Sequence, residues 1–175
     1  MKKITSVLLV CVLFLTQGCA RADRLRLDEP PFGETPFSAE IRGARGEYDF
    51  SAKIGIVPVE EGVCIRVEYT APEALSGIVV EALCREDGTA QGEAELLRSG
   101  VSVRLDAESL EGLLAPASCL LSLAEHTAVQ KDGETYELQF ENGATLRVDE
   151  KGDLISYADA SLRYDVVWLE HRMQS

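Results

Sequence analysis

The chain has 175 residues, enough for one domain with a hydrophobic core and too few for two domains of ordinary size. It carries 30 acidic and 17 basic residues, and its formal net charge of −13 at pH 7 would repel nucleic acid and anionic lipid surfaces. The composition therefore excludes nucleic-acid binding. It fits a protein at a cell surface whose net negative charge favours solubility.

The first 18 residues have the three parts of a bacterial secretion signal. Lys2 and Lys3 form a positively charged start, the run from Val7 to Leu15 is apolar and uncharged, and the small residue Gly18 precedes Cys19. The apolar run is shorter than the roughly 20 residues that span a bilayer. It therefore predicts a cleaved signal peptide rather than a membrane-spanning helix.

The residues before Cys19 resemble a lipobox, the lipidation site of bacterial lipoproteins, in which Leu, a small or hydroxyl residue, and Gly or Ala precede the cysteine. Gly18 and Cys19 match this pattern, whereas Thr16 stands where Leu is usual and Gln17 is larger than the usual residue. The resemblance implies cleavage after residue 18 and a diacylglycerol on Cys19, which anchors the chain to the extracytoplasmic face of the cell membrane. Secretion without a lipid is the alternative.

Residues 20–35 contain mixed charges, the pair Pro30-Pro31 and Gly33, and they show no apolar period of two or of 3.6. Such a segment predicts a tether that holds a folded part away from the membrane. The predicted organisation is a signal peptide at 1–18, a lipidated tether at 19–35 and one folded domain at 36–175.

From Phe37 onwards, apolar and polar residues alternate with a period of two, interrupted by turn residues such as the Ser99-Gly100 pair. This alternation predicts strands with one buried face, and hence an antiparallel sheet whose other face is in solvent. Six strands are predicted, at Phe37–Ile41, Tyr48–Ile56, Val63–Tyr69, Ile78–Cys84, Thr89–Leu97 and Val101–Leu105.

The period then changes to that of an α-helix. Apolar residues recur at helical spacing from Leu110 to Ala124, with Ser109 available as the N-cap and Pro116 in the middle. Because proline removes a backbone donor and clashes with the preceding turn, a kink or two short helices are expected there. Leucines on more than one side predict a helix buried against the sheet.

Alternation returns after Gly133 and predicts four more strands. The pair Asn142-Gly143 between two alternating runs predicts a hairpin with a type I′ turn, in which both central residues have positive φ. In the last strand, Trp168 is expected on the same face as Leu162. The four strands are Tyr136–Phe140, Leu146–Val148, Leu154–Tyr157 and Leu162–Trp168.

Cys64, Cys84 and Cys119 are the cysteines of the predicted domain, and their spacing does not match that of zinc sites. Three buried free thiols are the preferred interpretation, because a free cysteine packs as a small apolar residue. A disulfide between Cys64 and Cys84, which lie in adjacent predicted strands, is the alternative. The two histidines, His126 and His171, show no spacing typical of a metal ligand or a general base.

This order of elements behind a lipoprotein signal resembles the lipoprotein-localisation-factor half-barrel superfamily, which includes lipid carriers as well as sporulation and germination lipoproteins. Two segments carry the resemblance: the strand and turn from Val67 to Val80, and the run from Tyr136 to Asp153, which ends in a Gly-Asp-Leu turn. The resemblance implies an α+β, mainly β fold, in which a curved antiparallel sheet of about ten strands wraps as a half-barrel around the Leu-rich helical segment. In the carriers an apolar cavity holds acyl chains, and the family has no catalytic residues.

If the domain carries a lipid, apolar residues of the concave face are expected to line the site. The alternative is a packed core beneath the helix, with no room for a ligand. The candidate lining residues are Tyr48, Phe50, Ile54, Ile65, Val67, Leu113, Leu138, Phe140, Leu146 and Trp168.

Two function classes follow. The first is a non-enzymatic, membrane-anchored binding module that holds a lipid or docks an envelope protein. The second is a structural or regulatory lipoprotein of the cell envelope or of sporulation, with a filled core and no small ligand. Neither class needs a cofactor or a metal, and the sequence contains no motif for either.

Overall fold

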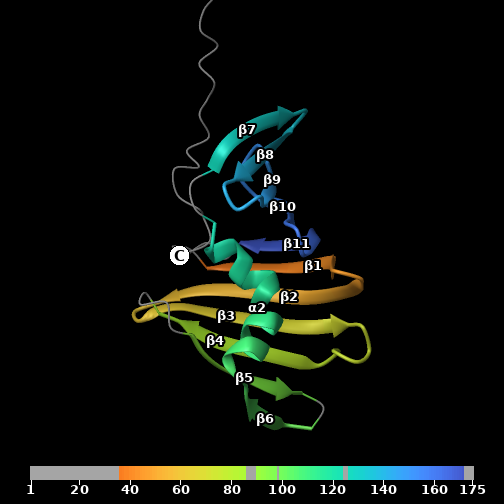
Figure 1. The fold of residues 1–175 in the computed structure, drawn as a ribbon, viewed down its shortest axis with the longest axis vertical. Coiled ribbons are helices and arrows are strands. Elements are labelled where there is room, and N and C mark those ends of the chain that lie inside the picture. Colours follow the sequence, from red (N-terminus) through yellow and green to blue (C-terminus); the bar gives the residue numbers. More distant parts are fainter. Residues whose placement is uncertain (1–35, 86–89, 98, 124–125, 172–175) are drawn as a thin grey trace, which may run out of the picture.

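The structure is a computed structural model, and it describes residues 36–85, 90–97, 99–123 and 126–171 (Figure 1). The predicted signal peptide and tether, with Cys19, lie outside these residues, so the anchoring and the domain boundaries remain predictions. Within the described ranges, no helix is long and apolar enough to cross a membrane.

The described chain forms one antiparallel sheet and one α-helix, α2 (Ala107–Leu121) (Figure 1). The strands are β1 (Phe37–Arg45), β2 (Tyr48–Val59), β3 (Gly62–Ala71), β4 (Ile78–Cys84), β5 (Ala90–Leu96), β6 (Val101–Arg104), β7 (His126–Asp132), β8 (Thr135–Phe140), β9 (Thr145–Asp149), β10 (Leu154–Ala158) and β11 (Leu162–His171). Their order across the sheet is β6-β5-β4-β3-β2-β1-β11-β10-β9-β8-β7.

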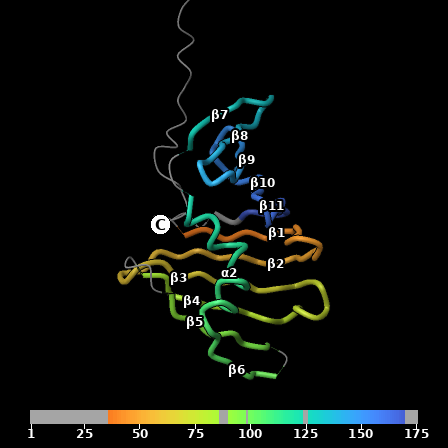
Figure 2. The backbone as a smooth tube through the Cα atoms, in the orientation of Figure 1, coloured from red at the N-terminus to blue at the C-terminus, as the bar shows by residue number. Residues whose placement is uncertain are grey.

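The chain builds this sheet in two halves that meet at β1 and β11. Strands β1 to β6 follow one another outward, α2 leads the chain back across the sheet, and β7 to β11 return towards β1. In Figure 2 the orange β1 and the blue β11 lie side by side, paired from Phe37 with His171 to Arg45 with Leu162. This open, curved sheet with a helix on its concave face confirms the predicted half-barrel fold.

The hairpin predicted at Asn142-Gly143 joins β8 to β9, but its turn is not the predicted type I′. Gly143 has a φ of 81°, whereas no described residue other than glycine has a positive φ. The Gly143 N–H donates to the Phe140 carbonyl (3.0 Å) and the Phe140 N–H donates to the Ala144 carbonyl (3.0 Å), which makes a three-residue loop. Asn142 instead stabilises the turn through its side chain, which accepts a hydrogen bond from the Ala144 N–H (3.0 Å).

Helix α2 is continuous through Pro116, so of the two predicted alternatives, a kink or two short helices, the division into two helices is wrong. Its N-cap is Asp106 rather than Ser109: the Asp106 side chain accepts a hydrogen bond from the Ser109 N–H (2.8 Å), which lowers the pKa of the Asp106 carboxyl. Pro116 has no N–H to donate to the carbonyl of Gly112, four residues earlier. Arg45 replaces that donor, because its Nη1 donates to the Gly112 carbonyl.

The core lies between α2 and the concave face of the sheet. The helix contacts β3 and also β2, β4 and β5, and in Figure 1 it crosses these strands. At Gly92 on β5 the approach is so close that an added Cβ would lie 2.8 Å from Cδ1 of Leu110. The helix residues buried in this core are Leu110, Leu114, Pro116, Ala117 and Leu120.

Candidate functional site

Six of the ten candidate lining residues belong to the packed interior. Because other side chains enclose these residues, the space at their positions is filled by the protein itself. Phe140 is half-buried and packs against the core, and the other five are fully buried: Ile54, Ile65, Val67, Leu138 and Leu146. At these positions the structure shows a packed core, which was the alternative to a lipid-binding cavity.

Three other candidates, Tyr48, Phe50 and Leu113, lie together at a groove between α2 and one end of the sheet. The groove has a volume of about 890 Å³ and is bounded by the β1–β2 turn, the loop between β3 and β4, and the N-terminal half of α2. The lining residues that the sequence analysis did not identify include Tyr69, Pro72, Leu75 and Pro116. Strand alternation could have identified Tyr69, which lies two residues after Val67 on the same face.

The tenth candidate, Trp168, lies on the face opposite to the one predicted. The register between β1 and β11 shifts between Glu40 and Ile41, so that Val166 pairs with Ile41 but Trp168 pairs with Glu40. The extra residue, Val167, forms a bulge that turns Trp168 to the face not covered by α2, where it is 55% exposed.

Aromatic rings line the groove from its mouth inwards. Tyr48 is 81% exposed at the mouth, whereas Phe50 and Tyr69 are buried inside. The rings of Phe50 and Tyr69 meet edge to face, with 6.3 Å between their centroids. The groove therefore offers an apolar surface that is open to solvent at one end.

Two hydrogen bonds join the sheet to α2 across the groove. Arg45 donates to the carbonyl of Gly112, and the Tyr69 hydroxyl donates to the carbonyl of Leu113 (2.8 Å). Burial raises the pKa of Tyr69 to about 12, and the positive charge of Arg45 acts in the opposite direction. Both polar groups therefore bind the helix backbone and hold α2 over the groove.

Replacing Tyr69 with phenylalanine is expected to lower the unfolding free energy by about 1 kcal/mol at pH 7, because one buried hydrogen bond is lost. Folding raises the pKa of Tyr69 from 10.0 to about 12, so the neutral phenol favours the folded state. That stabilisation is complete below pH 10 and is lost as the pH rises towards 12. Urea unfolding from pH 7 to 12 should therefore show a smaller alkaline loss for Tyr69→Phe than for the wild type.

The matched control is Tyr48→Phe, since Tyr48 is exposed and its hydroxyl group makes no hydrogen bond within the described residues. It is expected to follow the wild type at every pH. Equal alkaline losses for wild type and Tyr69→Phe would contradict the assignment of the shifted phenol to Tyr69.

A buried cluster of side chains surrounds Cys119 at the other end of α2. The Cys119 Sγ lies 3.6 Å from the Pro116 carbonyl oxygen and 3.6 Å from the Tyr164 hydroxyl, and the Tyr164 ring stacks on Tyr157. Burial raises the pKa of the Cys119 thiol to about 12, so the thiol is protonated at neutral pH. Cys119 is thus packed as a core residue rather than activated as a nucleophile.

Cys64 and Cys84 lie on opposite faces of the sheet, and both are free thiols. Cys64 alternates with the buried Ile65 and is exposed on the face away from α2, so its predicted burial is wrong. Cys84 pairs with Val63 and packs against the core, on the α2 side. Because a disulfide needs side chains that point towards one another, this arrangement excludes the Cys64–Cys84 bridge.

Thiol labelling of the native protein at pH 8 is expected to modify Cys64 at least ten times faster than Cys119. Cys64 is exposed, whereas Cys119 is partly buried and desolvation raises the pKa of its thiol to about 12. Peptide mass spectrometry after timed labelling measures both rates. Equal rates in the native protein, and not only after unfolding in urea, would contradict the packing of Cys119.

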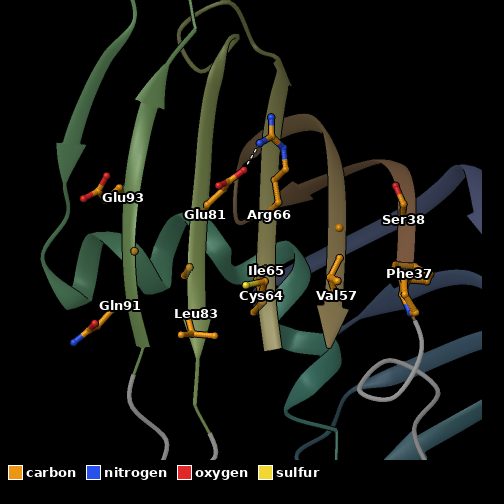
Figure 3. Close-up of a pocket in the computed structure, with 14 residues that line it drawn as sticks. Phe37, Ser38, Val57, Cys64, Ile65, Arg66, Glu81, Leu83, Gln91 and Glu93 are labelled. Carbon is orange, nitrogen blue, oxygen red and sulfur yellow. Dashed lines mark hydrogen bonds and ion pairs between the residues drawn. The ribbon is translucent and has the colours of Figure 1, made fainter. Parts of the chain in front are cut away.

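A second hollow, of about 730 Å³, lies on the face of the sheet not covered by α2 (Figure 3). Val57, Cys64 and Leu83 contribute its apolar lining, and Figure 3 shows Arg66 and Glu81 joined by an ion pair beside them. Of the ten candidates, Ile65 alone borders it. The groove, which three candidates line, is therefore the stronger candidate site.

The described residues contain no metal-binding arrangement: no group of three or more His, Cys, Asp or Glu side chains within them could hold a metal ion. His126 lies at the start of β7, away from the groove lining. The apolar lining of the groove is suited to binding an apolar molecule.

Comparison with known proteins shows similarity in fold. No family model and no curated protein matches the chain. An uncharacterised conserved protein from Thermus thermophilus matches with 13% identity and a TM-score of 0.53, over 86% of this chain and 85% of that chain. An outer membrane lipoprotein-sorting protein domain from Vibrio parahaemolyticus matches with 10% identity and a TM-score of 0.46, over 84% and 88%. A DUF1329 family protein from Desulfovibrio piger matches with 10% identity and a TM-score of 0.46, over 84% and 89%.

The TM-score of 0.53 with the Thermus thermophilus protein, at 13% identity, indicates a common fold and carries no information on a common ligand. The ligand that the protein binds depends on the shape and chemistry of the groove itself.

Proposed function

We propose that the chain is a lipoprotein anchored through Cys19 to the extracytoplasmic face of the cell membrane, and that it binds a lipid or another acyl-bearing ligand in the groove without catalysis. The groove is the observation that carries this proposal. Its volume of about 890 Å³ lies within the range of roughly 300 to 1,000 Å³ that is typical of ligand pockets. Its lining by Tyr48, Phe50, Leu75 and Leu113 suits an apolar chain.

The polar groups near the groove support binding rather than chemistry. Arg45 and Tyr69 direct their donors at backbone carbonyls of α2, which orients the helix and leaves the groove surface mainly apolar. The thiol of Cys119 is protonated and enclosed. A ligand would accordingly be bound mainly by apolar contacts. Its specificity would depend on the shape of the groove opening around Tyr48.

The filled interior favours a second candidate function, that of a structural or regulatory envelope lipoprotein without a small ligand. Ile54, Ile65 and Val67 occupy the centre of the concave face and leave no space there. The groove between α2 and the ends of β1 to β3 remains open, so the two candidates differ in whether that groove is occupied.

Lipid extraction separates the two candidates. Residues 23–175, purified without detergent and extracted with organic solvent, are expected to yield about one lipid per chain by mass spectrometry. A lipid-free domain that also fails to bind a fluorescent fatty acid would contradict the lipid-binding proposal and support the structural one.

The anchor is tested by replacing Cys19 with alanine in the full chain. Incorporation of a radiolabelled or clickable fatty acid is expected to be lost completely, because Cys19 is the proposed attachment site. Cys11→Ala is the matched control and is expected to keep the label. A Cys19→Ala chain that remains lipid-labelled would overturn the anchoring proposal.

A further inference from the structure

The apolar surface beneath α2 continues past the helix to the edge of the sheet at β6. One cross-strand row runs from the buried Val80 through Ala94 to Val103, which is 52% exposed. The next row runs from Ile78 through Leu96 to Val101, which is 53% exposed. Core-facing positions of β6 are thus open to solvent, which is unusual for residues that continue a hydrophobic core.

Strand β6 is also an unprotected edge. In the part of the chain that the structure describes, it pairs with β5 on one side and with no strand on the other. Exposed edges normally carry lysine, proline or an inward-pointing charge that prevents pairing with another chain. β7, at the other edge, carries Lys131 and Asp132, whereas the α2-facing side chains of β6 are Val101 and Val103.

The free backbone groups indicate what kind of partner covers β6. A lipid surface would cover the valines but would leave the outward N–H and C=O groups without hydrogen bonds, which is strongly unfavourable. A β-strand satisfies those groups and covers the valines together. The partner is therefore a strand.

Charge favours a second copy of this chain as the source of that strand. The chain has 30 acidic residues, yet none of them lies between Leu96 and Arg104. Of the two edge strands of the described sheet, β6 carries no acidic residue whereas β7 ends at Asp132, so two such acidic molecules meet at β6 with less repulsion between carboxylates. On β6 the only charge, that of Arg104, lies opposite Glu93 of the neighbouring strand β5.

We propose that β6 pairs antiparallel with β6 of a second copy about a two-fold axis at Ser102. In this register Ser102 faces the partner's Ser102, and Val101 faces the partner's Val103 on the α2 side of the sheet. Arg104 faces the partner's Gly100, so no like charges are opposed. The contact is self-complementary, as a two-fold interface requires, and it joins two open sheets into one.

The interface is small. Pairing of four residues and their valines buries less than the roughly 800 Å² per partner of a standard interface, so a weak dimer is expected in dilute solution. Copies confined to one membrane surface meet at a much higher effective concentration, which favours the pair. The inference rests on the proposed membrane anchor for this effective concentration, and it is independent of whether the groove binds a lipid.

Cross-linking through the two-fold axis tests the proposal. The full chain carries Ser102→Cys in a Cys64→Ser background, which removes the exposed native thiol, and membranes that contain it are treated with a mild oxidant. Disulfide-linked dimer on a non-reducing gel is expected to form at least ten times faster than with the matched control, Val129→Cys on β7. Equal rates for the two edges would overturn the proposal.

Adding Val103→Lys to the Ser102→Cys chain distinguishes a specific interface from random collision. Val103 is exposed, so the lysine is expected to leave the thermal unfolding of the monomer unchanged while cross-linking falls at least tenfold. Cross-linking that persists at the original rate would overturn the proposal. So would quenching of a Leu97→Trp, Trp168→Phe chain by brominated lipids without any dimer, because the edge would then face the bilayer.

Discussion

Replacing Gly43 with alanine is expected to lower the unfolding free energy by about 3 kcal/mol or more. Gly43 lies on β1, paired with Tyr164 of β11 on one side and with Phe50 of β2 on the other. An added Cβ would lie 2.0 Å from the carbonyl oxygen of Arg163 and 2.5 Å from the Cβ of Tyr164. Because these are backbone and near-backbone atoms, strand β11 would have to move, and forced overpacking of this kind costs about 1 to 3 kcal/mol or more.

The effect should be large because β1 and β11 form the only strand pairing between the two halves of the described sheet. Gly55→Ala on β2 is the matched control, since its nearest neighbour outside the adjacent residues would lie 3.9 Å from the new Cβ. Urea unfolding followed by circular dichroism is expected to place Gly55→Ala within about 0.5 kcal/mol of the wild type. Equal stabilities for the two variants would contradict the close approach at Gly43.

Most of the strands could be predicted from the sequence because most of them have one buried face. Strand β7 could not, because it is the edge of the sheet and its side chains from Thr127 to Asp132 are exposed. In the other edge strand, β6, Val101 and Val103 alternate with polar residues, whereas β7 has no apolar period of two and is therefore not revealed by alternation. The predicted strand that begins at Thr89 starts outside the described residues, and β5 is described from Ala90 to Leu96.

The errors at Pro116 and Trp168 share a cause: contacts between residues far apart in the sequence. Pro116 is accommodated in one helix because Arg45, on β1, donates to the carbonyl that the proline leaves without its usual donor. Trp168 changes face because Val167 bulges against β1. Local patterns describe the intrinsic preference of a segment, and neither of these contacts is part of a local pattern.

The candidate site was predictable only in part, because local patterns indicate some of its residues and long-range packing decides the others. Tyr48, Phe50 and Leu113 follow from alternation and helical spacing, and the structure brings them together at the groove. Pro72 and Leu75 lie in the loop between β3 and β4, where no period indicates which way a side chain points. Which apolar positions stay open and which pack together depends on where α2 crosses the sheet, and that is a property of the whole fold.

Replacing Leu113 with glutamate is expected to weaken the binding of a fatty acid to the groove by at least tenfold. Leu113 is half-buried on α2 and lines the groove, so the new carboxylate would lie against the bound apolar chain. Placing a charge in an apolar contact without a partner costs several kcal/mol, and each 1.4 kcal/mol corresponds to about tenfold in affinity. Titration of residues 23–175 with a fluorescent fatty acid measures the change.

The matched control is Val129→Glu, which makes the same kind of change at an exposed position on β7, outside the groove. It is expected to bind as the wild type does, and thermal unfolding should confirm that both variants remain folded. Unchanged affinity in Leu113→Glu would exclude the groove as the binding site. Equal weakening in both variants would instead indicate repulsion between the fatty acid and an already acidic protein, because the added charge at Val129 touches nothing in the groove.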